Sequence, residues 1–138
     1  MTIEPGTRIG PYQVVALLGT RYTMEEDFYR GRLESHGLEV LIPDAADRGT
    51  VHRVIYDELV RGEIRDASRR AYLEIIDRLR ARGARGVIAG CTEIELLVGS
   101  EDLDCAYFPT TRLHALAAVD AALGLLGLEP AILDRSPF

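Results

Sequence analysis

The strongest constraint on the fold is a repeated unit in which a short apolar run is followed by small or hydroxyl residues and then by a helical pattern. Strands are expected at residues 12–18, 38–43, 86–90 and 105–108. The first run is continuously apolar rather than alternating, which indicates a strand buried on both faces, as in a parallel sheet. Strands that alternate with helices predict an α/β fold, a single three-layer domain with a mainly parallel four-stranded sheet.

Capping residues and glycines predict where the helices begin and end. Thr23 and Glu26 form a capping-box pattern, so a first helix is expected to begin just after Thr23 and to end at Gly37. Phe28 and Leu33 are expected on its buried side. Further helices are expected over about 51–60, from Asp66 to Arg82 before Gly83, from Thr92 to Leu97, and over about 113–126 before Gly127.

The length of 138 residues is that of one domain. We expect the domain to span residues 12–127, with a flexible lead-in at 1–11 and a tail at 128–138. A content of 47% hydrophobic residues is enough to form a packed core. No apolar run approaches the roughly 18 residues of a membrane span, and the first ten residues lack the pattern of a signal peptide.

Charge and cysteine content narrow the partners and the compartment. The net charge is −6 and the cations form no basic run, so a nucleic-acid partner is not expected. Two cysteines do not make a disulfide framework, which favours a reducing cytoplasm. Three histidines and two cysteines without metal-type spacing predict no metal site.

Three strand-to-helix joints are expected to lie at one edge of the sheet, at residues 19–21, 90–93 and 109–111. In open α/β sheets, ligands bind outside the carboxyl ends of the strands. Each joint offers small residues, hydroxyls and free backbone N–H groups, which suit a carboxylate or a phosphate.

Cys91 is the sharpest candidate for chemistry. It lies between a buried strand and a helix start, and the positive end of a helix lowers the pKa of a thiol. Glu93 would oppose this effect if its carboxylate points at the sulfur. The alternative is a small buried hydrophobic residue, and the sequence leaves both interpretations open.

The other polar residues of the joints each have a functional and a structural interpretation. Thr92 could bind a substrate carboxylate or cap the helix, and Glu93 could orient a substrate amine or a histidine or simply favour the helix start. Thr110 and Thr111 could cap the last helix. His114 follows one turn later and could face the same crevice or be structural.

Three motifs stand at these joints in order: LGTRYTM at residues 18–24, GCTEI at residues 90–94 and TTRLHA at residues 110–115. Together they resemble the aspartate/glutamate racemase family, and the resemblance covers roughly residues 14–125.

The resemblance implies an amino-acid racemase that needs no cofactor and has two similar α/β domains facing each other across a cleft. Each domain contributes one cysteine, so that one thiolate removes the α-proton and the other thiol delivers a proton to the opposite face. By this resemblance Cys91 is the second of these cysteines and Thr92 a carboxylate-binding residue. Thr20, Thr110 and His114 match positions that line the pocket.

The resemblance is to the C-terminal half of a family member. Pro109 stands where the family has an acidic residue, and Cys105 lacks the flanking residues of the other catalytic cysteine, so we expect Cys105 in the core. The last helix of the family packs partly against the other domain, so its apolar face would be partly exposed in a monomer and would mark an interface. That face comprises Leu113, Leu116, Ala117 and Leu123.

Three functions therefore remain open. The chain could be a racemase of an acidic amino acid whose second half-site comes from a homodimer or from a complementary chain. It could be a one-cysteine enzyme similar to arylmalonate decarboxylases. It could also be a non-catalytic or truncated domain that binds a carboxylate near Thr20, Thr92 and Thr111 or serves as an assembly partner.

Overall fold

The computed structural model describes residues 14–125, so the expected lead-in at 1–11, the tail at 128–138 and both domain boundaries lie outside the described residues. Its sheet has four strands in the order β2-β1-β3-β4, and every pairing is parallel. The α/β fold and the parallel sheet are thus confirmed. The strands are β1 (Val14–Leu18), β2 (Glu39–Leu41), β3 (Gly86–Ala89) and β4 (Ala106–Pro109).

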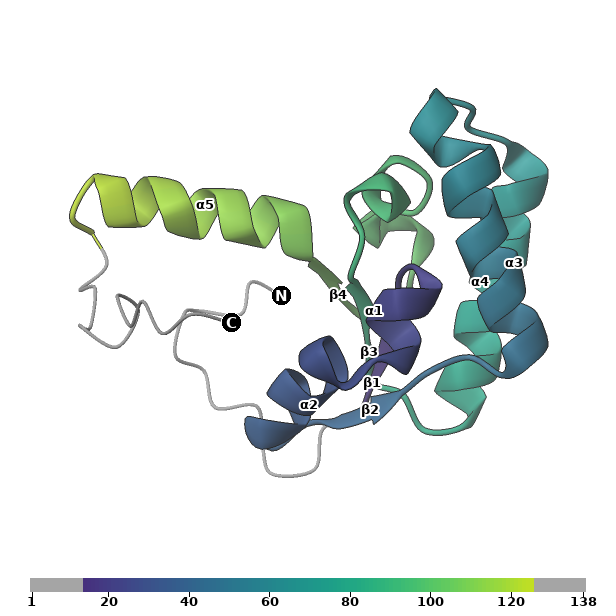
Figure 1. Ribbon diagram of the computed structural model, residues 1–138, viewed down its shortest axis with the longest axis horizontal. Coiled ribbons are helices and arrows are strands. Elements are labelled where there is room, and N and C mark those ends of the chain that lie inside the picture. The colour runs from purple at the N-terminus through teal and green to yellow at the C-terminus, as the bar shows by residue number, and fades with distance from the viewer. Residues whose placement is uncertain (1–13, 126–138) are drawn as a thin grey trace.

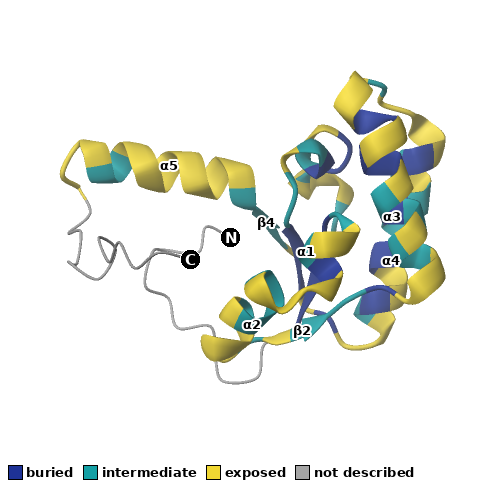
Figure 2. Cartoon of the chain, viewed as in Figure 1, coloured by how far each residue is buried: buried dark blue, intermediate teal, exposed yellow. Residues whose placement is uncertain are grey.

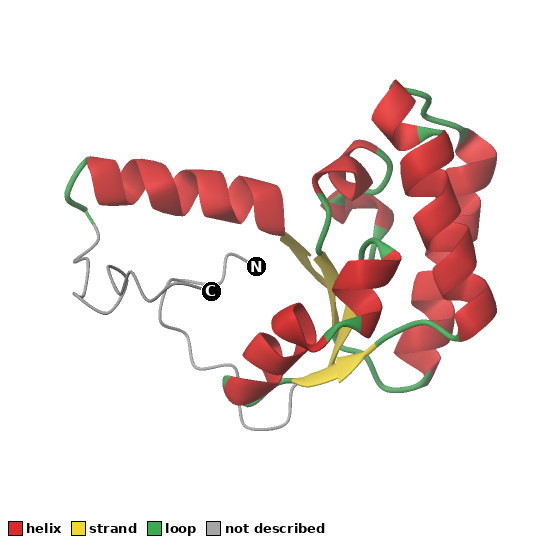
Figure 3. Cartoon of the chain, viewed as in Figure 1, coloured by secondary structure: helices red, strands yellow, loops and turns green. Residues whose placement is uncertain are grey.

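Helices fill the connections between the strands (Figure 3). None of the helices within residues 14–125 combines the length and the hydrophobicity of a membrane span. The α-helices are α1 (Arg21–Glu25), α2 (Asp27–Ser35), α3 (Ala45–Asp57), α4 (Asp66–Ala81) and α5 (Thr110–Ala122). The short 3₁₀ helices are η1 (Leu59–Arg61), η2 (Thr92–Leu96) and η3 (Ser100–Asp102).

The alternation of side chains along β1 divides the core between the two faces of the sheet. Ala16 and Leu18 point to the face covered by α3 and α4, where the larger cluster of buried side chains lies. Val15 and Leu17 point to the other face, where the smaller cluster packs against residues of α2. Figure 1 shows α2 and the α3–α4 pair on opposite sides of the strands.

The first helix differs from its prediction in both its start and its continuity. Thr20, not Thr23, is the N-cap, and its hydroxyl accepts a hydrogen bond from Thr23 N at 3.4 Å. The backbone is extended at Glu26, which separates α1 from α2. Phe28 is 67% exposed, contrary to expectation, whereas Leu33 packs against the smaller cluster.

Other helix boundaries also shift toward the nearest cap or glycine. Helix α3 begins at Ala45 rather than near residue 51, because the carboxylate of Asp44 accepts a hydrogen bond from Asp47 N at 2.9 Å. Helix α5 ends before Gly124, whose φ of 70° is left-handed, whereas the predicted stop at Gly127 lies outside the described residues.

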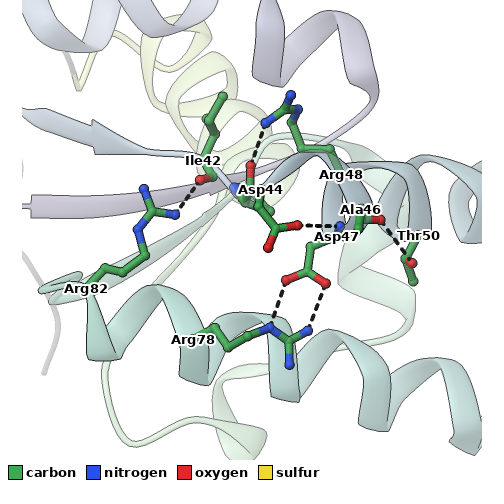
Figure 4. A network of polar contacts seen from close by, with 9 residues as sticks. Ile42, Asp44, Ala46, Asp47, Arg48, Thr50, Arg78 and Arg82 are labelled. Carbon is green, nitrogen blue, oxygen red and sulfur yellow. Dashed lines mark hydrogen bonds and ion pairs between the residues drawn. The ribbon is translucent and has the colours of Figure 1, made fainter.

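A polar network fastens the connection between β2 and α3 to helix α4 (Figure 4). The guanidinium of Arg78 donates to both carboxylate oxygens of Asp47, at 2.8 and 2.9 Å. Arg82 donates to the Ile42 carbonyl at 2.9 Å, and Arg48 donates to the Pro43 carbonyl at 2.7 Å. The cations therefore satisfy carbonyls at the end of β2 that the short strand leaves unpaired.

Helix α5 projects away from the sheet, and none of its residues is buried (Figures 1 and 2). Its large apolar side chains are about half exposed or more, in agreement with the expected uncovered face. These side chains are Leu113, Leu116, Val119 and Leu123.

We expect core and α5 substitutions to have very different effects on stability. Leu17→Ala removes a fully buried side chain and should lower the free energy of unfolding by about 2–5 kcal/mol. Leu116→Ala, at a residue 50% exposed, should change it by less than about 0.5 kcal/mol in the monomer. Urea denaturation at low protein concentration measures both values, and equal losses would contradict the exposed position of α5.

Candidate functional site

Three neighbouring strands end at one level and bring the three joints together. Leu18 pairs with Ala89, and Ala89 pairs with Pro109. Gly90 N donates to the Leu18 carbonyl at 2.7 Å, which joins the first two joints. The Thr110 hydroxyl donates to the Ala89 carbonyl at 2.6 Å, which joins the third. The predicted meeting of the joints is therefore confirmed.

Glycine is needed where two of these joints touch. A Cβ on Gly90 would lie 3.0 Å from the Leu18 carbonyl oxygen and 3.1 Å from a methyl group of Thr23. A Cβ on Gly19 would lie 2.9 Å from the Thr23 side chain. The two glycines thus allow the loop that carries Thr20 to pack against the loop that carries Cys91.

Cys91 is held in an extended conformation as the residue that precedes η2. It is half-buried against the larger core cluster, and its sulfur donates a hydrogen bond to Glu93 Oε2 at 2.8 Å. Burial, followed by the bond to Glu93 and the charge of Glu93, raises the pKa of Cys91 to about 11. The expected lowering by a helix start does not prevail, because η2 is a short 3₁₀ helix and the carboxylate faces the sulfur.

The Thr92 and Glu93 side chains take different positions. Thr92 is exposed at the start of η2, and the N-cap of η2 is Cys91, which makes no side-chain capping bond. The hydrogen bond from Cys91, followed by one from Thr92, lowers the pKa of Glu93. Glu93 is thus committed to its own segment rather than to a histidine.

The third joint contributes one inward hydroxyl. Thr110 is half-buried, whereas Thr111 is exposed and donates its backbone N–H to Glu95 Oε2 at 2.9 Å. Neither threonine is the cap of α5, since the N-cap is Pro109 and has no side-chain bond. His114 is exposed on α5, so within this chain it is not enclosed with the three joints.

Two tyrosines and a histidine near the joints were not assigned to the site from the sequence. Tyr72 of α4 donates its hydroxyl to the Val51 carbonyl at 2.7 Å, and burial, then Cys91, raises its pKa. Burial raises the pKa of Tyr29 of α2, while a hydrogen bond with Thr110 acts in the opposite direction. His52 of α3 accepts a hydrogen bond from Arg21 N at 3.0 Å, at the start of α1. Each of these contacts joins residues that are far apart in the sequence, so no local sequence pattern could predict it.

Cys105 lies at the opposite edge of the sheet. It precedes β4, and the first residue of β4, Ala106, pairs with Gly86 at the start of β3. With about 3.3 Å per residue, Cys91 and Cys105 are on the order of 15–20 Å apart along the strands. Cys105 is partly buried against the core, as expected, and it cannot serve the same edge as Cys91.

The site offers a thiol, a carboxylate and hydroxyls. Within residues 14–125, no group of three or more His, Cys, Asp or Glu side chains could hold a metal ion. A thiol paired with a carboxylate can transfer a proton. Three backbone N–H groups that were expected to be free are bonded: Arg21 N to His52, Gly90 N to the Leu18 carbonyl and Thr111 N to Glu95.

Comparison with known proteins agrees with this arrangement. Residues 8–123 match the Asp/Glu/Hydantoin racemase family. The chain belongs to this family.

Solved structures show the same fold. The chain is 54% identical to a crystal structure described as "a putative Asp/Glu Racemase from Yersinia pestis", with a TM-score of 0.76 over 80% of this chain and 49% of that chain. It is 32% identical to PH1733, an aspartate racemase homologue from Pyrococcus horikoshii OT3, with a TM-score of 0.73 and the same two coverages. Picrophilus torridus aspartate racemase, 21% identical, shares the fold with a TM-score of 0.63, over 86% of this chain and 48% of that chain. The chain spans about half the length of each of these structures.

The two threonines of the third joint provide a matched pair of substitutions. Thr110→Val removes the donor to the Ala89 carbonyl and should lower the free energy of unfolding by about 0.5–1.5 kcal/mol. Thr111→Val keeps the backbone bond to Glu95 and should change it by less than about 0.5 kcal/mol. Thermal or urea unfolding compares the two, and a larger loss for Thr111→Val would contradict the inward position of Thr110.

Proposed function

We propose that the chain provides half of the active site of a racemase that acts without a cofactor on aspartate, glutamate or a related acidic amino acid. The observation that supports this most directly is the Cys91 thiol, paired with Glu93 at the edge where the three joints meet. Membership of the racemase family supports the class of reaction.

In this proposal the substrate lies across the carboxyl ends of β1, β3 and β4. Its α-carboxylate binds the hydroxyls of Thr20 and Thr92, while Thr110, whose hydroxyl donates to the Ala89 carbonyl, lines the pocket and Thr111 lies at the rim. Cys91 then exchanges a proton with the α-carbon as a general acid or base, and Glu93 contacts its sulfur. His114 approaches the substrate once α5 is covered by a partner.

Inversion at the α-carbon requires a second proton-transferring group on the opposite face of the substrate. Cys105 faces the other edge of the sheet, and the chain has about half the length of the structures it matches. We therefore propose that a second copy of this chain or a complementary chain supplies that group. A two-fold axis would bring the Cys91 residues of two copies face to face.

Hydrogen exchange at the α-carbon tests the chemistry. The protein is incubated with L-aspartate or L-glutamate in heavy water, while proton NMR follows the α-proton and chiral chromatography follows the enantiomers. We expect deuterium uptake with inversion, reduced by about a hundredfold or more in Cys91→Ala. Cys105→Ala is the matched control and should retain the wild-type rate.

Uptake that persists in Cys91→Ala would contradict the assignment of Cys91. An absence of uptake at any protein concentration would contradict a racemase formed by this chain alone. Release of carbon dioxide from a disubstituted malonate would then identify the one-cysteine alternative, which the protonated thiol of Cys91 favours because decarboxylation needs one proton donor.

Self-association tests the homodimer. If α5 is the contact, Leu116→Glu should prevent dimer formation, because it places a charge in the apolar face of the helix. Sedimentation velocity over a range of concentrations compares the variant with the wild type, and Arg112→Glu is the matched control on the same helix. A wild-type chain that remains monomeric throughout would contradict the homodimer and leave the complementary chain.

A further inference from the structure

The Cys91 and Glu93 side chains belong to one short, stiff segment. Ile94 N donates to the Cys91 carbonyl at 3.2 Å, which closes the first turn of η2 around Glu93. The Ile94 side chain is buried in the core, which fixes the position of the turn. The sulfur and Glu93 Oε2 are therefore held 2.8 Å apart by the fold and not by a flexible loop.

The groups that face the sulfur do not favour a negative charge there. Glu93 presents a carboxylate from η2. Tyr72 of α4 lies close enough for the charge of Cys91 to raise the pKa of its phenol, which stays neutral. The charge of Glu58, which is 4% exposed, also raises the pKa of Tyr72; Glu58 accepts a hydrogen bond from Ser68 and contacts Arg53 and Arg65. The charge closest to the sulfur is thus that of a carboxylate.

We propose that Glu93 is a positioning residue that keeps Cys91 in its protonated form, so that this chain delivers the proton and a base on a complementary chain, rather than a second Cys91, removes the α-proton. This inference rests on the proposed function and specifies the task of each half of its site.

The proton balance of the step is simple. A base on the opposite wall takes the α-proton, and the electron pair of the broken C–H bond remains on the substrate as a carbanion. That pair then takes the proton of Cys91, the S–H bond breaks, and its electrons stay on sulfur as a thiolate. The thiolate lies against the carboxylate of Glu93, so it readily takes up a proton again and returns to the starting form.

The pKa of Cys91 gives the size of the effect. With a pKa of about 11, roughly one Cys91 side chain in 10⁴ is a thiolate at pH 7. Without substrate, Cys91 is thus almost always a thiol that can donate a proton, and only rarely a thiolate that can accept one.

Titration of the thiol tests this inference without substrate. In a Cys105→Ala background, thiolate absorbance and the rate of alkylation by iodoacetamide report Cys91 alone as the pH is raised. We expect Glu93→Gln to lower the pKa of Cys91 by one unit or more and to raise its alkylation rate at pH 7 about tenfold. Glu95→Gln is the matched control, because Glu95 bonds Thr111 N and not the sulfur.

The opposite results would overturn the proposal. A higher pKa or slower alkylation in Glu93→Gln would mean that Glu93 accepts the thiol proton and activates Cys91 as a base. An unchanged pKa would mean that Glu93 has no influence on the proton. If Glu93→Gln fails to fold, Glu93→Asp takes its place, because the shorter side chain draws the carboxylate away from the sulfur and should also lower the pKa of Cys91. A lowered pKa without any substrate exchange would leave the effect of Glu93 on Cys91 standing and would contradict the racemase instead.

Discussion

The hydrogen bond from Gly90 N to the Leu18 carbonyl continues the pairing of β1 with β3 past the end of the strands, and the rest of the site depends on it. It holds the Thr20 loop against the Cys91 loop at a distance that leaves no room for a Cβ on Gly90. The Thr110 hydroxyl repeats the arrangement on the other side of β3, through the Ala89 carbonyl. Three loops are thus fixed by backbone groups of strands whose side chains form the core, so the positions of the polar side chains follow from the sheet.

The core and the site are joined through helix α4. Tyr72 is fully buried, and its hydroxyl donates a hydrogen bond to the Val51 carbonyl of α3. It lies close enough to Cys91 for the charge of the sulfur to raise the pKa of Tyr72. The same helix is fastened to the end of β2 by Arg78 and Arg82. The environment of the thiol is therefore set in part by a helix whose position depends on contacts at the edge strand β2.

The parts of this structure that could be predicted from the sequence are those that depend on short local sequence patterns. The strands, the joints and the meeting of Thr20, Cys91 and Thr110 follow from apolar runs and from the geometry of parallel sheets. The predicted cap of the first helix was wrong: Thr23 and Glu26 fit the capping-box pattern, but Thr20, three residues earlier, is the N-cap.

Two further features depend on contacts that no local pattern contains. The pKa of Cys91 depends on burial and on the direction of the Glu93 side chain, and both are set by tertiary packing. The place of His114 depends on what covers α5, since within residues 14–125 that helix buries no residue. The resemblance to the racemase family pointed to Cys91 and His114, but only the structure shows that this chain by itself does not bring His114 to the joint that carries Cys91.

Helix α5 has a consequence for the order in which a complete site would form. A 13-residue helix without a buried side is marginal in water, whereas the sheet and its covering helices have a closed core of their own. The domain can therefore fold first, and in the proposed assembly α5 would become more firmly ordered once its apolar face is covered. Because Thr111 at the start of α5 is bonded to Glu95 in the same turn region as Glu93, that late ordering would reach the segment that holds the thiol. The cellular concentration of the chain and its partner would then set how many sites are complete at any moment.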